Sequence, residues 1–266
     1  MSLRRAALLA TGAMLASAGV AEARPLRVMS LDQCGDQYAL ALAPDATLAL
    51  SPRADDPDSW LRAEAWGHRR IRPTLEAALT FRPDVVVRYW GGEPRLLAAL
   101  EARGVRVVTI VDAQTMDGIR GNIRSVAEPL GENDRGRMLI DAMDARLAEA
   151  RPRSPVRRSA LYLTAGGFTA GQGTLIDAIL TAAGYINLTI APGFAPVSVE
   201  RVALSPPSRF VLGFFDQIRA DWRGPGRHPV VRKAAVGRVA GRLPAAALTC
   251  PAWFAADAAA MLKAGS

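Results

Sequence analysis

Short apolar runs alternate with segments of helical period along the chain. The runs are rich in β-branched residues, which is typical of buried strands, and the segments between them repeat apolar residues every three or four positions, as a helix does. The pattern predicts strands at 26–31, 47–50, 84–89, 105–111, 159–164 and 209–214, and helices at 36–42, 74–81, 94–103, 113–129, 132–150, 174–183, 197–204 and 253–263. This alternation predicts parallel sheets covered by helices on both faces.

One predicted helix divides this pattern in two. The helix at 132–150 carries an apolar stripe formed by Met138, Leu139, Ala142, Met143 and Leu147, and it ends in the Pro- and Arg-rich stretch ARPRSPVRR, after which the alternation of strand and helix begins again. We therefore expect an α/β fold of two lobes, each with a parallel sheet. The N-terminal lobe would cover 24–131, the linking helix 132–152 and the C-terminal lobe 153–266.

The first residues have the organisation of a secretory signal peptide. Arg4 and Arg5 precede an apolar run at 6–20, and Ala21-Glu22-Ala23 follows as a small-residue cleavage pattern. A buried N-terminal helix is the alternative, but the order of the three regions favours export. We expect residues 1–23 to be removed and the mature protein to work in the periplasm.

The two cysteines, Cys34 and Cys250, leave two alternatives open. Thiols tend to oxidise outside the cytoplasm, so the pair is a candidate for one disulfide between the two ends of the chain. Two buried, unpaired cysteines are the other alternative. No C-x-x-C motif occurs, which argues against a thioredoxin-like redox role.

The chain is basic, with a formal net charge of +8. Its arginines are dispersed along the sequence, whereas a nucleic-acid-binding protein usually gathers them on one helix or stripe. Solvated surface arginines are therefore favoured over a nucleic-acid interface, and attraction of an anionic ligand is their second use.

The residue inventory offers little for catalysis or phosphate binding. There are only two histidines, His68 and His228, and no G-x-S-x-G or H-E-x-x-H motif is present. The glycine-rich stretch LYLTAGGFTAGQGTLIDAIL resembles a P-loop in its spacing, but Gln172 stands where the phosphate-binding lysine is needed. An exported protein also meets little nucleotide, so this loop is not expected to hold a phosphate.

Two loops with aromatic residues beside glycines suggest a cleft between the lobes. Phe168 follows a predicted strand in the second lobe, and Arg88, Tyr89 and Trp90 precede Gly-Gly at the end of a strand in the first. In α/β folds ligands bind at the carboxyl ends of the strands. Ordinary core packing of these rings is the alternative.

Several stretches, taken in order, resemble the periplasmic binding proteins of ABC importers for ferric siderophores and cobalamin. They are LRVMSLDQCGDQ, TLEAALTFRPDVVVRYWGGEPRLLAALEARGVRVV, LYLTAGGFTAGQGTLIDAILTAAGYIN and VSVERVALSPPSRFVLGFF, and they cover nearly all of the mature chain. The resemblance implies two Rossmann-like lobes joined by a rigid helix, with a metal chelate bound between them. It also implies a monomeric binding protein without catalysis, cofactor or bound metal ion of its own, whose partner is an ABC permease in the inner membrane.

The same resemblance nominates site residues. Trp90 matches the cobalamin binder's tryptophan before Gly-Gly, and Phe168 matches a ligand-facing loop by position. Phe215 and Trp222, in FFDQIRADWRGPGRHP, are further candidates for ligand contact, and Arg53, Arg88 and Tyr89 are the candidates for polar contacts with a chelate.

Glu76 and Glu200 correspond to the family's two glutamates, one on each lobe, that meet arginines of the permease. The loops that carry Cys34 and Cys250 would border the cleft, which favours the disulfide. The competing hypotheses are an exported two-lobed enzyme acting on an anionic substrate, which lacks an evident acid–base pair, and a binder of a free metal ion, for which two histidines are few.

Overall fold

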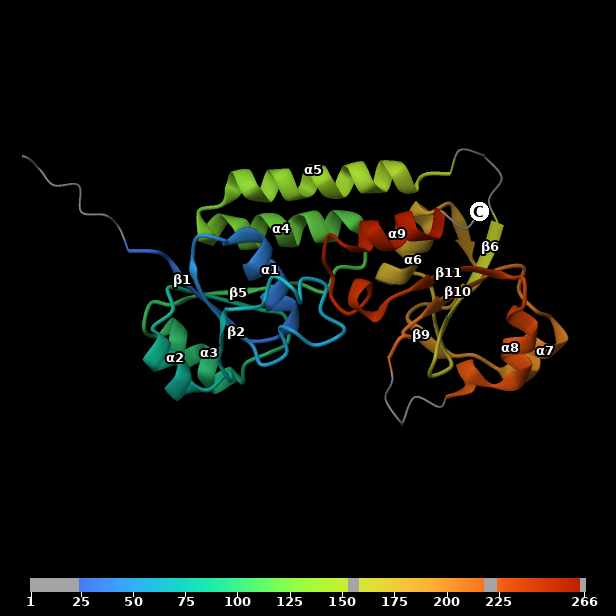
Figure 1. The fold of residues 1–266 in the computed structure, drawn as a ribbon, viewed down its shortest axis with the longest axis horizontal. Coiled ribbons are helices and arrows are strands. Elements are labelled where there is room, and N and C mark those ends of the chain that lie inside the picture. The colour runs from blue at the N-terminus through green and yellow to red at the C-terminus, as the bar shows by residue number, and fades with distance from the viewer. Residues whose placement is uncertain (1–23, 153–157, 218–223, 264–266) are drawn as a thin grey trace, which may run out of the picture.

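The computed structural model describes residues 24–152, 158–217 and 224–263, so the predicted signal peptide and Trp222 lie outside the described residues. The chain forms two α/β lobes side by side, and one long helix runs along the same side of both (Figure 1). This is the predicted fold class. Among the described residues, no helix combines the length and the apolar character needed to cross a membrane.

The N-terminal lobe contains a five-stranded, fully parallel sheet in the order β3-β2-β1-β4-β5. Its strands are β1 (Arg27–Ser30), β2 (Thr47–Leu50), β3 (Arg69–Arg70), β4 (Val85–Arg88) and β5 (Arg106–Thr109), and its helices are α1 (Gln33–Leu42), α2 (Leu75–Phe81), α3 (Pro94–Glu101) and α4 (Met116–Leu130). The hydrophobic pattern predicts all of these except β3, which is only two residues long.

Both faces of this sheet are buried, which explains why its strands are apolar at nearly every position. Val28 and Val85 belong to the cluster that contains residues of α1 and α4. Their neighbours Met29 and Val86 belong to the opposite cluster, with Phe81 of α2 and residues of α3. Successive side chains of a strand point to opposite faces of the sheet, so each strand packs against the helices on both faces.

The C-terminal lobe contains a four-stranded parallel sheet in the order β11-β10-β6-β8. One cluster joins this sheet to α6 and α9, and a separate cluster joins it to α7 and α8. The strands are β6 (Arg158–Thr164), β8 (Tyr185–Asn187), β10 (Phe210–Gly213) and β11 (Val239–Leu243), and the helices are α6 (Leu175–Ala182), α7 (Val199–Leu204), α8 (Pro229–Ala235) and α9 (Ala255–Lys263), with 3₁₀ turns at Pro225–Arg227 and Ala245–Ala247.

The glycine-rich stretch is only partly the loop that the sequence suggests. Its residues Phe168–Ala170 form strand β7, which pairs antiparallel with β9 (Phe194–Pro196). The prediction of an open loop at Phe168 is therefore wrong. The pattern of three residues was too short to reveal a strand whose partner lies more than twenty residues away along the chain.

The long helix α5 (Asn133–Ala150) lies where the helix joining the lobes was predicted. It packs on α4 over the first lobe and on α9 over the second (Figure 1). At 1.5 Å per residue its 18 residues span roughly 27 Å. Met143 of the predicted apolar stripe is buried, but Met138 is 70% exposed, so the stripe is narrower than the pattern suggests.

The two lobes share a continuous core. Residues of both sheets belong to one hydrophobic cluster, which also includes α9. Across the junction the Tyr38 ring of α1 lies 5.4 Å from that of Trp253, and the Trp60 ring stacks 5.3 Å from that of Phe254. The Tyr38 hydroxyl donates a hydrogen bond to the carbonyl of Pro251 at 2.7 Å. The segment before α9 thus fastens the end of the chain to the first lobe.

Candidate functional site

A cavity of about 580 Å³ lies between the two lobes. This volume falls within the range of about 300–1,000 Å³ that is usual for small-molecule sites. The first lobe contributes Tyr89, Asp112 and Gln114, and the second contributes residues 172–176, Ile179, residues 192–194 and residues 248–251. The cavity therefore exists only because the lobes are held together.

Of the described residues predicted to contact ligand, Tyr89 is the one that lines this cavity. Its hydroxyl donates a hydrogen bond to Oδ1 of Asp112 at 3.1 Å. Burial raises the pKa of Tyr89 to about 12, and the negative charge of Asp112 adds to the effect. The phenol therefore stays protonated near neutral pH and presents a neutral, hydrogen-bonded ring to the cavity.

Asp32, which the sequence analysis did not single out, holds the loop that carries Tyr89 and Trp90. One of its carboxylate oxygens accepts hydrogen bonds from the backbone N–H groups of Cys34 and Gly35, which caps α1. The other accepts from the backbone N–H groups of residues 89, 90 and 91 at 2.7–3.0 Å. The available signal was an Asp directly after an apolar strand and before a helix.

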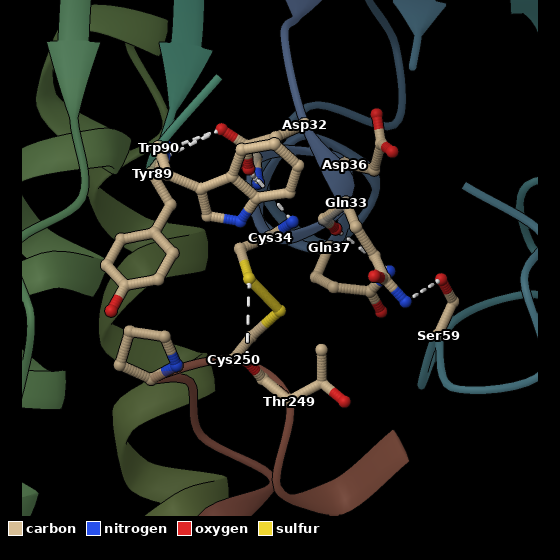
Figure 2. Close-up of a disulfide and its surroundings, with 12 residues drawn as sticks. Asp32, Gln33, Cys34, Asp36, Gln37, Ser59, Tyr89, Trp90, Thr249 and Cys250 are labelled. Atoms are coloured by element: carbon tan, nitrogen blue, oxygen red, sulfur yellow. Dashed lines mark hydrogen bonds between the residues drawn. A yellow bond between two sulfur atoms is a disulfide. The ribbon is translucent and has the colours of Figure 1, made fainter. Parts of the chain in front are cut away.

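The Gly-Gly sequence after Trp90 is explained by this arrangement. A Cβ atom on Gly91 would lie 2.4 Å from the carbonyl oxygen of Leu31 and 2.9 Å from Cβ of Asp32. Only glycine lets the loop pass so close to the carboxylate. The Trp90 ring is left 56% exposed and is drawn near the Tyr89 ring in Figure 2, but it is not part of the cavity wall.

Arg53 and Arg88, the two arginines nominated for ligand contact, bond to neighbouring residues of the first lobe. Arg88 donates from Nε to the carbonyl of Gly91 and from Nη1 to the Thr109 hydroxyl at 3.4 Å. Arg53 pairs with Asp56 at 2.7 Å and with Asp58 at 3.6 Å. Neither guanidinium belongs to the wall of the interlobe cavity.

In the second lobe the ribbon formed by β7 and β9 brings a different phenylalanine to the cavity. Phe194 lines it, whereas Phe168, on the paired strand, is half exposed and does not. A Cβ atom on Gly171 would lie 1.7 Å from the carbonyl oxygen of Ala191. The glycines thus permit close backbone contact within the ribbon. No sequence signal pointed to Phe194, because its place depends on this long-range pairing.

Phe215 lies in another cavity, of about 540 Å³, within the second lobe. The guanidinium carbons of Arg227 and Arg242 lie 5.2 and 6.0 Å from the centre of its ring. The structure does not bring Phe215 together with Tyr89, and Trp222 lies outside the described residues.

The structure bonds Cys34 to Cys250, the pairing that the sequence left open. The bridge joins the first turn of α1 to the loop before α9, and Figure 2 shows it below the Trp90 ring and beside the Tyr89 ring. Thr249, Cys250 and Pro251 all line the cavity. The bridge therefore fixes a part of the cavity wall that belongs to the second lobe.

Glu76 and Glu200 are exposed, one on each lobe, in the first turns of α2 and α7. Figure 1 places these helices in the outer parts of the two lobes, away from α5. The pKa of Glu200 lies below its ordinary value, because its own backbone N–H and the Ser198 hydroxyl donate hydrogen bonds to it. Both side chains are available to a partner that approaches both lobes.

The described residues contain no group of three or more His, Cys, Asp or Glu side chains placed to hold a metal ion. The interlobe cavity instead combines aromatic and aliphatic walls with amide and hydroxyl groups and the carboxylate of Asp112. Such a surface is suited to binding a preformed organic ligand.

The family model for periplasmic binding proteins matches residues 32–208, which is 177 of the 266 residues. This chain belongs to that family. The binding protein is therefore not an enzyme. Family members deliver ligands to ABC permease complexes, and they carry no cofactor. A search among curated proteins found no significant match.

Several solved structures share the fold of the binding protein. The periplasmic heme-binding protein HutB of Vibrio cholerae has a TM-score of 0.70 at 16% identity, covering 90% of this chain and 98% of its own. The vitamin B12 binding protein BtuF of Vibrio cholerae has 0.62 at 22%, covering 90% and 95%. The heme-binding protein BhuT, solved with two hemes, has 0.67 at 24%, covering 90% and 97%. At these identities the similarity establishes the fold alone.

Proposed function

We propose that this binding protein is the periplasmic component of an ABC importer and that it captures a metal chelate between its lobes for delivery to the permease. The interlobe cavity is the observation that carries this proposal, because both lobes build it from loops near the ends of their strands. The family to which the chain belongs supports the same role.

The proposed organisation follows the predicted one. Residues 1–23 act as the signal peptide that directs export, residues 24–131 and 153–266 form the two lobes, and residues 132–152 form the interlobe helix. The mature protein works as a monomer, since one chain supplies both walls of the cavity.

The ligand we propose is a chelate of the ferric siderophore, corrinoid or heme type. Tyr89 and Phe194 face the cavity, and the exposed rings of Trp90 and Phe168 belong to the loop and the ribbon that carry them. Flat aromatic surface binds macrocycles and catecholates well, because stacking buries a large apolar area. The heme and vitamin B12 binding proteins that share this fold support a chelate as cargo.

A thermal-shift screen of the purified mature protein tests the proposal. Cobinamide, cobalamin, hemin and several ferric siderophores are added one at a time. A ligand present at 100 times its dissociation constant stabilises the folded state by about 2.7 kcal/mol, which raises the melting temperature of a domain of this size by roughly 5–10 °C.

A matched pair of variants ties the response to the cavity. Tyr89→Ala, which removes part of the wall, should lose most of the shift, whereas Met138→Ala, on the exposed side of α5, should keep it. No shift with any chelate would overturn the proposed function.

A further inference from the structure

The described wall of the interlobe cavity carries a negative charge, although the chain as a whole is positively charged. Among its described lining residues, Asp112 is the one that carries a formal charge. The polar side chains beside it are neutral, namely Tyr89, Gln114, Gln172, Thr174 and Thr249, and the rest of the wall is apolar or glycine. For a chain with net charge +8, an acidic cavity is not expected from composition.

The nearby cationic groups lie outside the wall of the cavity. Arg88 donates to the carbonyl of Gly91 and to Thr109, and Arg53 lies between Asp56 and Asp58. The first turn of α6 reaches the cavity, but it carries its own acidic residue, Asp177, and its N–H at that position is already capped by Thr174. The described wall therefore offers an anion little compensation.

We infer that the cavity selects uncharged or cationic chelates with amide or carbonyl groups at their periphery, and that Asp112, oriented by its hydrogen bond from Tyr89, sets this preference. The inference rests on the proposed function, because it assigns the charge of the cargo in that same site. It covers corrinoids and hydroxamate chelates, which share this chemistry, and it excludes hemin and catecholate chelates, which are anionic.

The two scales of charge act on different steps of binding. The net positive charge of the whole molecule acts at long range and affects how often an anion arrives. The charge of Asp112 acts at contact distance, where one carboxylate changes the affinity for a singly charged ligand by roughly three- to tenfold at a partly exposed site. Exposed amides of Gln114 and Gln172 are placed to bond an amide-rich periphery.

Equilibrium titration with four probes tests the inference. Aquocyanocobinamide and ferrioxamine B each carry one positive charge, hemin carries two carboxylates, and ferric enterobactin is triply negative. We expect one or both cationic probes to bind the wild type more tightly than either anion, and the comparison between them separates a corrinoid from a hydroxamate. Raising the salt concentration should weaken the binding of a cationic probe.

Variants test whether Asp112 causes the preference for cationic over anionic chelates. Asp112→Asn should lower the affinity for a cationic probe about three- to tenfold and raise the affinity for hemin by a similar factor. It should also remove most of the salt dependence of binding. Tyr89→Phe keeps the ring and the negative charge but removes the orienting hydrogen bond, so it should narrow the gap between cationic and anionic probes without reversing their order. Asp141→Asn removes an exposed carboxylate from α5, away from the cavity, and should change nothing.

Two results would overturn the inference. If an anionic chelate binds most tightly and Asp112→Asn leaves the order unchanged, the charge assignment fails while the proposed function stands. If no chelate binds at all, the proposed function fails and the inference fails with it.

Discussion

Two buried carboxylates of the first lobe show how single residues shape this binding protein. Asp32 and Asp36 both follow β1 and are both almost fully buried, yet their surroundings differ. Asp32 accepts hydrogen bonds from five backbone N–H groups, whereas Asp36 accepts hydrogen bonds from the backbone N–H and the hydroxyl of Ser51. The first carboxylate holds the loop at residues 89–91 in place, and burial raises the pKa of the second.

Asp32→Asn should destabilise the protein and loosen the Trp90 loop. The amide replaces an accepting oxygen with a donor that faces N–H groups, and the cost is about 3 kcal/mol because buried charged hydrogen bonds are lost. Urea unfolding measures the loss, and titration with a chelate should show weaker binding. Asp45→Asn, at an exposed position of the same lobe, is the control and should stay within about 0.5 kcal/mol.

Asp36 should make stability depend on pH. Burial raises its pKa to about 6, well above the ordinary value, so between about pH 4 and 6 the folded state binds more protons than the unfolded state. The wild type should therefore gain up to roughly 3 kcal/mol relative to Asp36→Asn as the pH falls from 7 to 4, and lose that gain as the pH rises through 6. Unfolding curves for both proteins at several pH values measure this gap. Parallel pH profiles would contradict the assignment.

At the scale of elements, the lobes are joined in two ways. Helix α5 connects them through the chain, and the segment before α9 connects them again through the Cys34–Cys250 bridge and the packing of Tyr38 against Trp253. Helices are stiffer than extended strands, and a second attachment restricts rotation about the first. We therefore expect small lobe movements on ligand binding.

Removing the bridge should lower the free energy of unfolding by about 3–5 kcal/mol. The two cysteines are separated by 216 residues, and a bridge that closes so long a loop restricts the unfolded chain strongly. The comparison uses oxidised wild type, wild type reduced while unfolded and then refolded, and the Cys34→Ser, Cys250→Ser double variant. The chain has no other cysteine, so the last two should unfold at the same urea concentration. Equal midpoints for all three proteins would count against a stabilising bridge.

At the scale of the whole molecule, the cavity and the proposed docking residues occupy different places. The cavity lies between the lobes, and Glu76 and Glu200 lie on helices in their outer parts, away from α5 (Figure 1). We therefore expect mutations to separate ligand capture from delivery.

The Glu76→Ala, Glu200→Ala double variant should bind a chelate with a dissociation constant within about twofold of the wild type, yet lower uptake in cells by at least about tenfold, because complementary charges orient the complex with the permease. Asp134→Ala with Asp141→Ala removes two exposed carboxylates from α5 and serves as the control. Normal uptake by the glutamate variant would remove the docking assignment.

The sequence by itself determined the elements whose signal is local. Apolar runs, helical periods and the proline-rich stretch after Ala150 predicted four strands of the first sheet, strands β6 and β10 of the second, and the long helix, since buried strands and amphipathic helices impose their periods on any sequence that forms them. The pattern did not predict β8, β11 or α8 of the second lobe. The shortest strands, such as β3 and β7, were not predicted because two or three residues are too few to show a hydrophobic period.

Only the tertiary structure decided the composition of the site. It placed Tyr89 and Phe194 in one cavity, set Phe215 in another, engaged Arg53 and Arg88 elsewhere, and brought Cys34 to Cys250. It also revealed five N–H groups around Asp32 and, among the described residues that line the cavity, the single formal charge of Asp112. These contacts join residues that are far apart in the chain, and a local sequence pattern does not indicate which distant segment will pack against it.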